Sequence, residues 1–163
     1  MKRDEINHIK DDLRLRPLDF EGGYYRETYR SVQTDANGRP CGTAILYMLT
    51  DEESCYSALH RLDADEIYHF YLGDPVELTL LEPNGQWRTV ILGHDLAAGQ
   101  QIQAVVPVGV WQGSRLVKGG CGALLGTTMA PGFSIDGFES GKREILICAY
   151  PGAAERIALL TRD

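Results

Sequence analysis

Short segments rich in apolar residues, separated by turn signals, recur along most of the chain. Runs of about four to eight residues with β-branched or aromatic side chains, bounded by Gly, Pro, Asn or Asp, are typical of β-strands. The sequence predicts such strands at 24–33, 43–50, 54–62, 66–72, 76–80, 86–92, 101–106 and 121–129. Asn84-Gly85 and Asn37-Gly38 are hairpin-type turn signals between them. An irregular segment at 130–139 and a further apolar segment at 144–149 follow the last of these strands.

Helical periodicity is confined to the two ends of the chain. Ile6, Ile9 and Leu13 recur at helical spacing, so we expect a helix over 3–16, closed by Pro17. A short helix over 153–161 would turn Ile157 and Leu160 inward. Many short strands with a helix at each end predict an all-β sandwich or barrel. We expect one domain over residues 1–163, with the barrel at about 24–150.

The segment 59–73 contains the densest group of reactive side chains. Asp63-Ala64-Asp65 is a turn signal between two apolar strands. Because side chains alternate along a strand, Glu66, Tyr68 and Phe70 should share one face. If His60 points to the same side, then His60, Glu66 and Tyr68 converge on one cavity. His69 should point away from it.

Two motifs resemble those of a known superfamily. His60-x-Leu62-x3-Glu66-x6-Gly73 resembles the first cupin motif, and Pro107-x-Gly109-x2-Gln112 resembles the second. Further strings, at 21–30, 65–71, 106–107 with 111–113, and 130–133 with 138–139, are similar to the cupin_5 (DUF985) family. The resemblance implies a double-stranded β-helix, a jelly-roll barrel around a small-molecule cavity, and a homodimer. The family has no established reaction.

The resemblance also bears on metal binding. Metal-binding cupins usually hold a divalent ion with three His and one Glu. This chain keeps His60 and Glu66, but Leu62 and Gln112 stand at the other two positions. Leu cannot ligate a metal and Gln offers a weak amide oxygen. We therefore expect no metal and no other cofactor; if a divalent metal binds, its ligands would be His60, Glu66 and Gln112.

The composition argues against several classes of binding partner. The formal charge of −7 and the pI near 5.1 argue against binding nucleic acid or anionic membranes. The first residues lack the apolar core of a signal peptide, so we expect a cytoplasmic protein. The four Cys form no Cys-x-x-Cys pair, which argues against a zinc knuckle. Three of them lie in apolar, strand-like surroundings, and we expect these to be buried.

Acid–base chemistry is one function that these residues could support. His60 would take a proton near neutral pH, Tyr68 would donate one, and Glu66 would orient the imidazole. This resembles the metal-free sugar epimerases of the cupin superfamily. Arg26 and Arg30, on one face of the strand at 24–33, would hold an anionic group of the ligand, or that face would meet solvent or a second subunit.

Two alternatives stay open. In the first, the protein binds a ligand without turnover, in a pocket lined by Tyr68, Phe70, Trp111 and Phe133, where His60, Glu66 and Gln112 fix the ligand's orientation. In the second, a metal is bound and the protein is an oxygenase or isomerase. In each case the expected partner is a small polar or anionic molecule, and the sequence does not name it.

Overall fold

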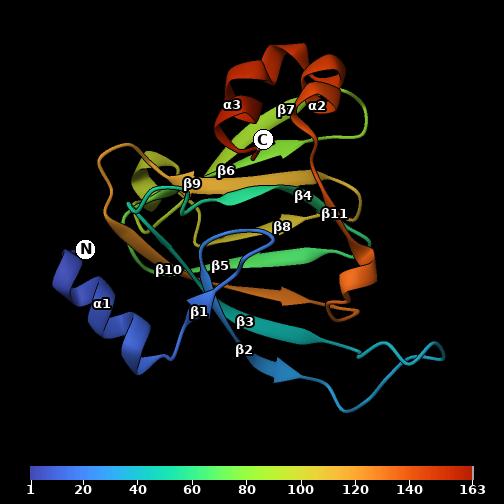
Figure 1. Ribbon diagram of the computed structural model, residues 1–163, viewed down its shortest axis with the longest axis horizontal. Coiled ribbons are helices and arrows are strands. Elements are labelled where there is room, and N and C mark those ends of the chain that lie inside the picture. Colours follow the sequence, from blue (N-terminus) through green and yellow to red (C-terminus); the bar gives the residue numbers. More distant parts are fainter. Residues whose placement is uncertain (163) are drawn as a thin grey trace.

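The computed structural model describes residues 1–162 and consists of two packed antiparallel sheets (Figure 1). One sheet has the strand order β1-β2-β3-β10-β5-β8, and the other has the order β11-β4-β9-β6-β7. The strands are β1 (Arg16–Pro17), β2 (Tyr24–Arg30), β3 (Thr43–Thr50), β4 (Ser57–Leu62), β5 (Glu66–Gly73), β6 (Val76–Leu81), β7 (Trp87–Leu92), β8 (Gln103–Val106), β9 (Trp111–Leu116), β10 (Gly122–Met129) and β11 (Phe138–Ser140). Short 3₁₀ turns lie at η1 (Leu96–Ala98), η2 (Ile135–Gly137) and η3 (Pro151–Ala153).

The hydrophobic core lies between the two sheets because each strand turns alternate side chains inward. On β5, Glu66, Tyr68 and Phe70 are buried, whereas Ile67 and His69 are only partly buried on the outer face. This is the alternation that the sequence predicts. Inward-facing residues of both sheets, among them Tyr47, Tyr68, Phe70, Leu78 and Leu80, form the largest cluster of buried side chains. The architecture confirms the expected all-β fold.

Helices cover parts of the two outer faces. Helix α1 (Arg3–Asp12) packs Ile6 against Met48 and Leu124 of the six-stranded sheet. Helices α2 (Arg143–Ala149) and α3 (Ala154–Leu159) lie over the five-stranded sheet at the top of Figure 1. Leu146, Ile157 and Leu160 pack there against Leu59 and Leu81. Within residues 1–162, no helix combines the length and the apolar character that crossing a membrane requires.

One local prediction needs correction, and two further segments take forms that the sequence pattern left undefined. The first helix ends at Asp12 rather than residue 16, and Arg14 has a positive φ of 52°. The apolar segment at 144–149, for which the sequence predicts no secondary structure, lies in helix α2, where i, i+4 spacing turns Leu146 and Tyr150 toward the same cluster. Trp111 and Gln112 begin strand β9, directly after the turn at 108–109.

The cysteines are also less buried than expected. Cys41 and Cys148 are exposed, and Cys55 and Cys121 are partly exposed. Cys41, Cys55 and Cys121 lie in the loops just before β3, β4 and β10, and Cys148 lies in helix α2. The apolar neighbours that suggested burial belong to the adjoining strands, so the expectation that three cysteines are buried is wrong.

Candidate functional site

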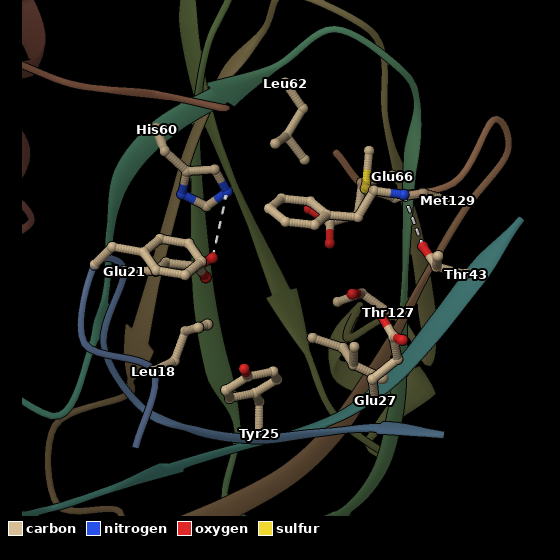
Figure 2. Close-up of a pocket in the computed structure, with 13 residues that line it drawn as sticks. Leu18, Glu21, Tyr25, Glu27, Thr43, His60, Leu62, Glu66, Thr127 and Met129 are labelled. Carbon is tan, nitrogen blue, oxygen red and sulfur yellow. Dashed lines mark hydrogen bonds and ion pairs between the residues drawn. The ribbon is translucent and has the colours of Figure 1, made fainter. Parts of the chain in front are cut away.

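A cavity lies between the two sheets at the end where β4 finishes and β5 begins (Figure 2). It has a volume of about 70 Å³, which suits a small ligand and not a large one. The side chains around it come from β2, β3, β4, β5 and β10 and from two loops. They are Leu18, Phe20, Glu21, Tyr25, Glu27, Thr43, Ile45, His60, Leu62, Glu66, Thr127, Met129 and Phe133.

His60 projects into this cavity from β4 and is almost completely buried. Its Nδ1 lies 2.8 Å from the carbonyl oxygen of Ala58. A carbonyl can only accept, so Nδ1 carries the proton and, in the neutral ring, Nε2 has a free lone pair. The ring of Phe138 stacks on the imidazole with centroids 5.0 Å apart. The tautomer and the plane of the ring are therefore both held by neighbouring groups.

Glu21 lies beside His60 and comes from the loop before β2. Its Oε1 accepts a hydrogen bond of 2.7 Å from the Ser57 hydroxyl. Its Oε2 lies 3.9 Å from His60 Nε2, which is too far for a hydrogen bond (Figure 2). Gly22 and Gly23, both with positive φ, turn the chain sharply after Glu21. The buried hydroxyl of Tyr47 donates to the Gly22 carbonyl and fixes this turn.

Glu66 is the buried carboxyl group of the site, and it comes from the sheet opposite His60. Its Oε2 accepts a hydrogen bond of 2.9 Å from the amide nitrogen of Gln112, and the Thr127 hydroxyl also bonds to it. Burial raises the pKa of the Glu66 carboxyl, and the negative charge of Glu21 raises it further. The imidazole of His60 and the hydrogen bonds from Thr127 and Gln112 only partly offset this rise. Glu66 is thus more easily kept protonated than an exposed glutamate.

The predicted arginines lie apart from the cavity lining. Tyr25 and Glu27 line the cavity, so Arg26, which stands between them on β2, belongs to the opposite face of the strand. The register of β2 shifts between Glu27 and Tyr29. After this irregularity, Arg30 forms two hydrogen bonds to the Glu27 carboxylate, of 2.6 and 2.9 Å. Arg30 therefore neutralises a cavity carboxylate, and the role of both arginines in holding an anionic ligand stays a prediction.

Aromatic rings surround the mouth of the cavity. Phe20 is 44% exposed, stacks on Phe133 with centroids 6.4 Å apart, and meets Phe138 edge-on at 4.9 Å. The backbone nitrogen of Phe133 donates to the Thr43 hydroxyl. Arg39 holds the same region in place, since its guanidinium bonds both the Gly132 carbonyl and the Asp63 carboxylate. The mouth is therefore built by three segments that are distant in sequence.

The other predicted site residues lie around the cavity rather than in its lining. Tyr68 and Phe70 are buried in the core between the sheets, and burial raises the pKa of the Tyr68 phenol well above its usual value. Trp111 packs in the outer cluster beneath the C-terminal helices, with the Arg61 guanidinium 4.7 Å from its ring. Gln112 lies behind Glu66, and its Oε1 is buried without a hydrogen-bond partner. Catalytic or ligand-binding roles for these four stay predictions.

Sequence reasoning places His60, Glu66 and Phe133 in the site and misses Glu21, Tyr25, Glu27 and Thr127. A signal for Glu21 was present. A Glu followed by two glycines, at the start of a string shared with the DUF985 family, indicates a side chain held by a tight turn.

The residues at the metal positions do not fit the usual ligand set. Leu62 lines the cavity and offers no donor atom, and the amide nitrogen of Gln112 already donates to Glu66. Among residues 1–162, no three His, Cys, Asp or Glu side chains are arranged to hold a metal ion. The metal content of the protein stays a prediction for measurement.

Comparison with known proteins agrees with this architecture. Residues 7–141 match the family model described as Cupin_5, cupin superfamily (DUF985). The uncharacterized protein YML079W of Saccharomyces cerevisiae is 30% identical over 159 residues, covering 86% of this chain and 78% of that protein. The crystal structure of SO0799 from Shewanella oneidensis is 34% identical with a TM-score of 0.87, covering 96% of both chains.

Two further structures extend the likeness. A hypothetical protein from Leishmania major is 28% identical with a TM-score of 0.87, covering 96% of this chain and 98% of that one. Oxalate decarboxylase of Bacillus subtilis has a TM-score of 0.55 at 16% identity, covering 86% of this chain and 35% of that one. At such low identity, the last comparison shows a shared fold alone.

Proposed function

Because this chain belongs to the DUF985 family of the cupin superfamily, we propose that it is a metal-independent isomerase or epimerase. Its cavity would bind a small polar molecule and transfer a proton on it. One observation carries the proposal. His60 is held with Nδ1 protonated, and its free Nε2 faces a cavity whose other wall carries a buried carboxyl group.

His60 is the proposed base. Its lone pair is available on Nε2 because the Ala58 carbonyl holds the proton on Nδ1. Glu21, whose Oε2 lies 3.9 Å from Nε2, would stabilise the imidazolium that forms when Nε2 takes a proton. Removal of water by the apolar walls would strengthen this charge interaction.

Glu66 is the proposed acid. Its raised pKa favours the protonated form that can donate to a ligand oxygen. It stands on β5 in the six-stranded sheet, whereas His60 stands on β4 in the five-stranded sheet. A ligand between the sheets would therefore have the base on one side and the acid on the other.

The proton balance is simple. A carbon beside a carbonyl loses its proton to Nε2 of His60, and its electron pair becomes the double bond of an enol. The carbonyl oxygen gains the proton of Glu66. If the first carbon carries a hydroxyl group, His60 returns its proton to the former carbonyl carbon while that hydroxyl gives its proton to the Glu66 carboxylate, which yields the isomer and restores both side chains. For the epimer, the enol oxygen returns its proton to Glu66, a water molecule protonates the first carbon on the opposite face, and His60 releases its proton to solvent. No oxidant or reductant is needed.

The test begins with native mass spectrometry of the purified protein, to find a small molecule retained in the cavity. That molecule is then incubated with the protein in D₂O, and exchange of its C–H groups is followed by NMR. We expect exchange with the wild-type protein and, for His60→Asn, a rate lower by a factor of about 10² to 10⁴. His8→Asn is the matched control, because His8 is exposed on α1 and forms an ion pair with Asp12.

The non-catalytic alternative gives a different result. A retained ligand that does not exchange in D₂O, or that exchanges equally in His60→Asn, would refute proton transfer by His60. Elemental analysis of the same sample for Zn, Fe, Mn and Ni tests the metal-independent part. A stoichiometric metal lost in His60→Asn would refute that part.

A further inference from the structure

The charges around the cavity are unbalanced. Glu21, Glu27 and Glu66 contribute three carboxyl groups, of which burial favours the protonated, neutral form of Glu66. In the part of the chain that the structure describes, no Lys or Arg lines the cavity. Arg30 neutralises Glu27 from outside through two hydrogen bonds. Among residues 1–162, no Lys or Arg forms an ion pair with Glu21, so its carboxylate is the unbalanced negative charge of the cavity. An anionic ligand would therefore be repelled from the cavity, and a cationic ligand would be attracted to it.

Two acceptor atoms face each other without a donor between them. In the neutral tautomer set by Ala58, His60 Nε2 is an acceptor, and Glu21 Oε2 is an acceptor 3.9 Å away. His60 is 2% exposed and lines the cavity, so a ligand reaches its Nε2 through the cavity. Oε1 of Glu21 already accepts from Ser57, which leaves Oε2 to interact with a ligand. A positively charged group with N–H donors fits Oε2 of Glu21, while Nε2 of His60 faces the adjoining part of the ligand.

The remaining lining suits the carbon skeleton of such a ligand. Leu18, Ile45, Leu62 and Met129 give the floor and walls an apolar surface. The rings of Phe20 and Phe133 lie near the entrance, and aromatic faces attract organic cations as well as apolar groups. An inorganic cation would use none of this surface.

We propose that the cavity selects a small organic cation, a protonated amine whose N–H groups donate to Oε2 of Glu21. The carbon next to the nitrogen then lies beside His60 Nε2. This inference rests on the proposed function and narrows its substrate to an amino ketone or an amino sugar without an acidic group. It differs from the anionic ligand that Arg26 and Arg30 suggest in the sequence.

Three probes of nearly equal shape test the charge preference. They are isobutylamine, which is protonated at neutral pH, neutral isobutanol, and isobutyrate. Binding to the purified full-length protein is measured for each by saturation-transfer NMR titration. We expect isobutylamine to bind at least tenfold more tightly than isobutanol, and isobutyrate to bind more weakly than either. Equal or tighter binding of isobutyrate would overturn the proposal, and this comparison requires no mutant.

A charge-removing variant locates the interaction. Glu21→Gln keeps the size of the side chain, and we expect it to weaken isobutylamine about tenfold while isobutanol binding changes little. Glu53→Gln is the matched control, since Glu53 is exposed in the loop between β3 and β4. Unchanged isobutylamine binding in Glu21→Gln would refute the assigned contact.

These measurements are independent of turnover. A cation preference that depends on Glu21, without deuterium exchange, would refute the enzyme and keep the ligand class. Deuterium exchange on a retained anionic or neutral molecule would support the enzyme and refute the cationic ligand class.

Discussion

At the scale of single residues, one backbone carbonyl determines what His60 can do. Ala58, two positions earlier on the same strand, accepts from Nδ1 and so directs the free lone pair of Nε2 into the cavity. A histidine on a strand would otherwise be free to adopt either tautomer. The two neighbouring carboxyl groups are likewise set by their hydrogen-bond partners. Glu21 accepts from the hydroxyl of Ser57, whereas the buried Glu66 accepts from the amide of Gln112.

Glu66 should reduce stability at neutral pH. Its pKa in the folded protein is raised by burial, so the folded state binds a proton that the unfolded chain has already lost. The stabilisation of the folded state by this bound proton is fully present below the usual pKa of glutamate. It is lost as the pH rises from there through the pKa of Glu66 in the folded protein. We expect Glu66→Gln to be more stable than wild type at pH 7 by about 1 kcal/mol.

The measurement is urea unfolding of wild type and Glu66→Gln between pH 4 and pH 8. The difference in the free energy of unfolding between Glu66→Gln and wild type should grow with pH, while Glu53→Gln should show the same pH dependence as wild type. A Glu66→Gln variant that is less stable at pH 7 would show that the carboxylate is well satisfied in the folded state. The same variant should lose deuterium exchange, because an amide cannot act as the acid.

Residues on regular strands were predictable and residues on loops were less so. The period of two places Glu66 and Phe70 on the inner face without any tertiary information. Glu21 has no such pattern, because its position follows from a glycine turn and from hydrogen bonds made by distant residues. Trp111 shows what alternation along a strand does not predict. Alternation tells which residues share a face, but the contacts of Trp111 depend on the C-terminal helices that cover its face.

At the scale of elements, the turn at Gly22-Gly23 sets the position of Glu21. Gly23 has φ of 71°, and a Cβ there would lie 2.7 Å from the Tyr47 hydroxyl and 2.9 Å from the Met48 carbonyl oxygen. Both contacts are too short, and Met48 belongs to the central strand β3, which cannot easily move. The turn therefore requires glycine for its conformation and for its space.

We expect Gly23→Ala to lower the free energy of unfolding by roughly 2–4 kcal/mol. Gly38→Ala is the matched control, since Gly38 has a similar φ of 82° but a Cβ there would meet open space. That control should lose only about 1 kcal/mol, from backbone strain. Chemical denaturation of the two variants checks this, and equal losses would mean that β2 and β3 can separate to accept the methyl group.

Most strand positions were recoverable from the sequence, but strand β9 at 111–116 and the helix at 143–149 were not. Arg143–Ala149 is almost entirely apolar between its first residues and Ala149, so it has no clear period. Its helical state follows from its place on the five-stranded sheet, where Leu146 and Tyr150 meet Leu59 and Leu81. The secondary structure of this segment therefore depends on tertiary packing and not on its sequence pattern alone.

At the scale of the whole molecule, the helices leave part of the six-stranded sheet uncovered. Tyr71 on β5 and Val105 on β8 are 46% and 50% exposed, and β8 is one of the two edge strands of this sheet. The resemblance to cupins predicts a homodimer, and this exposed apolar region is a suitable contact. We expect light scattering to give a mass of twice 18.1 kDa.

Val105→Glu should shift the protein toward a monomer, because it would bury charge at the contact. Val32→Glu is the control, since Val32 is 97% exposed in the loop between β2 and β3. A wild-type mass of one chain would refute the dimer, and a dimer unaffected by Val105→Glu would place the contact elsewhere.

The three segments that form the mouth have a consequence for how this protein could diversify. His60 and Glu66 are carried by strands whose backbones are fixed on both sides, whereas Phe20, Phe133 and the Arg39 contacts belong to loops. Loop residues can be exchanged without rebuilding the sheets. Relatives could thus acquire new ligands through changes at the entrance alone, and a directed library confined to positions 20, 39 and 133 would explore selectivity while sparing the reactive groups.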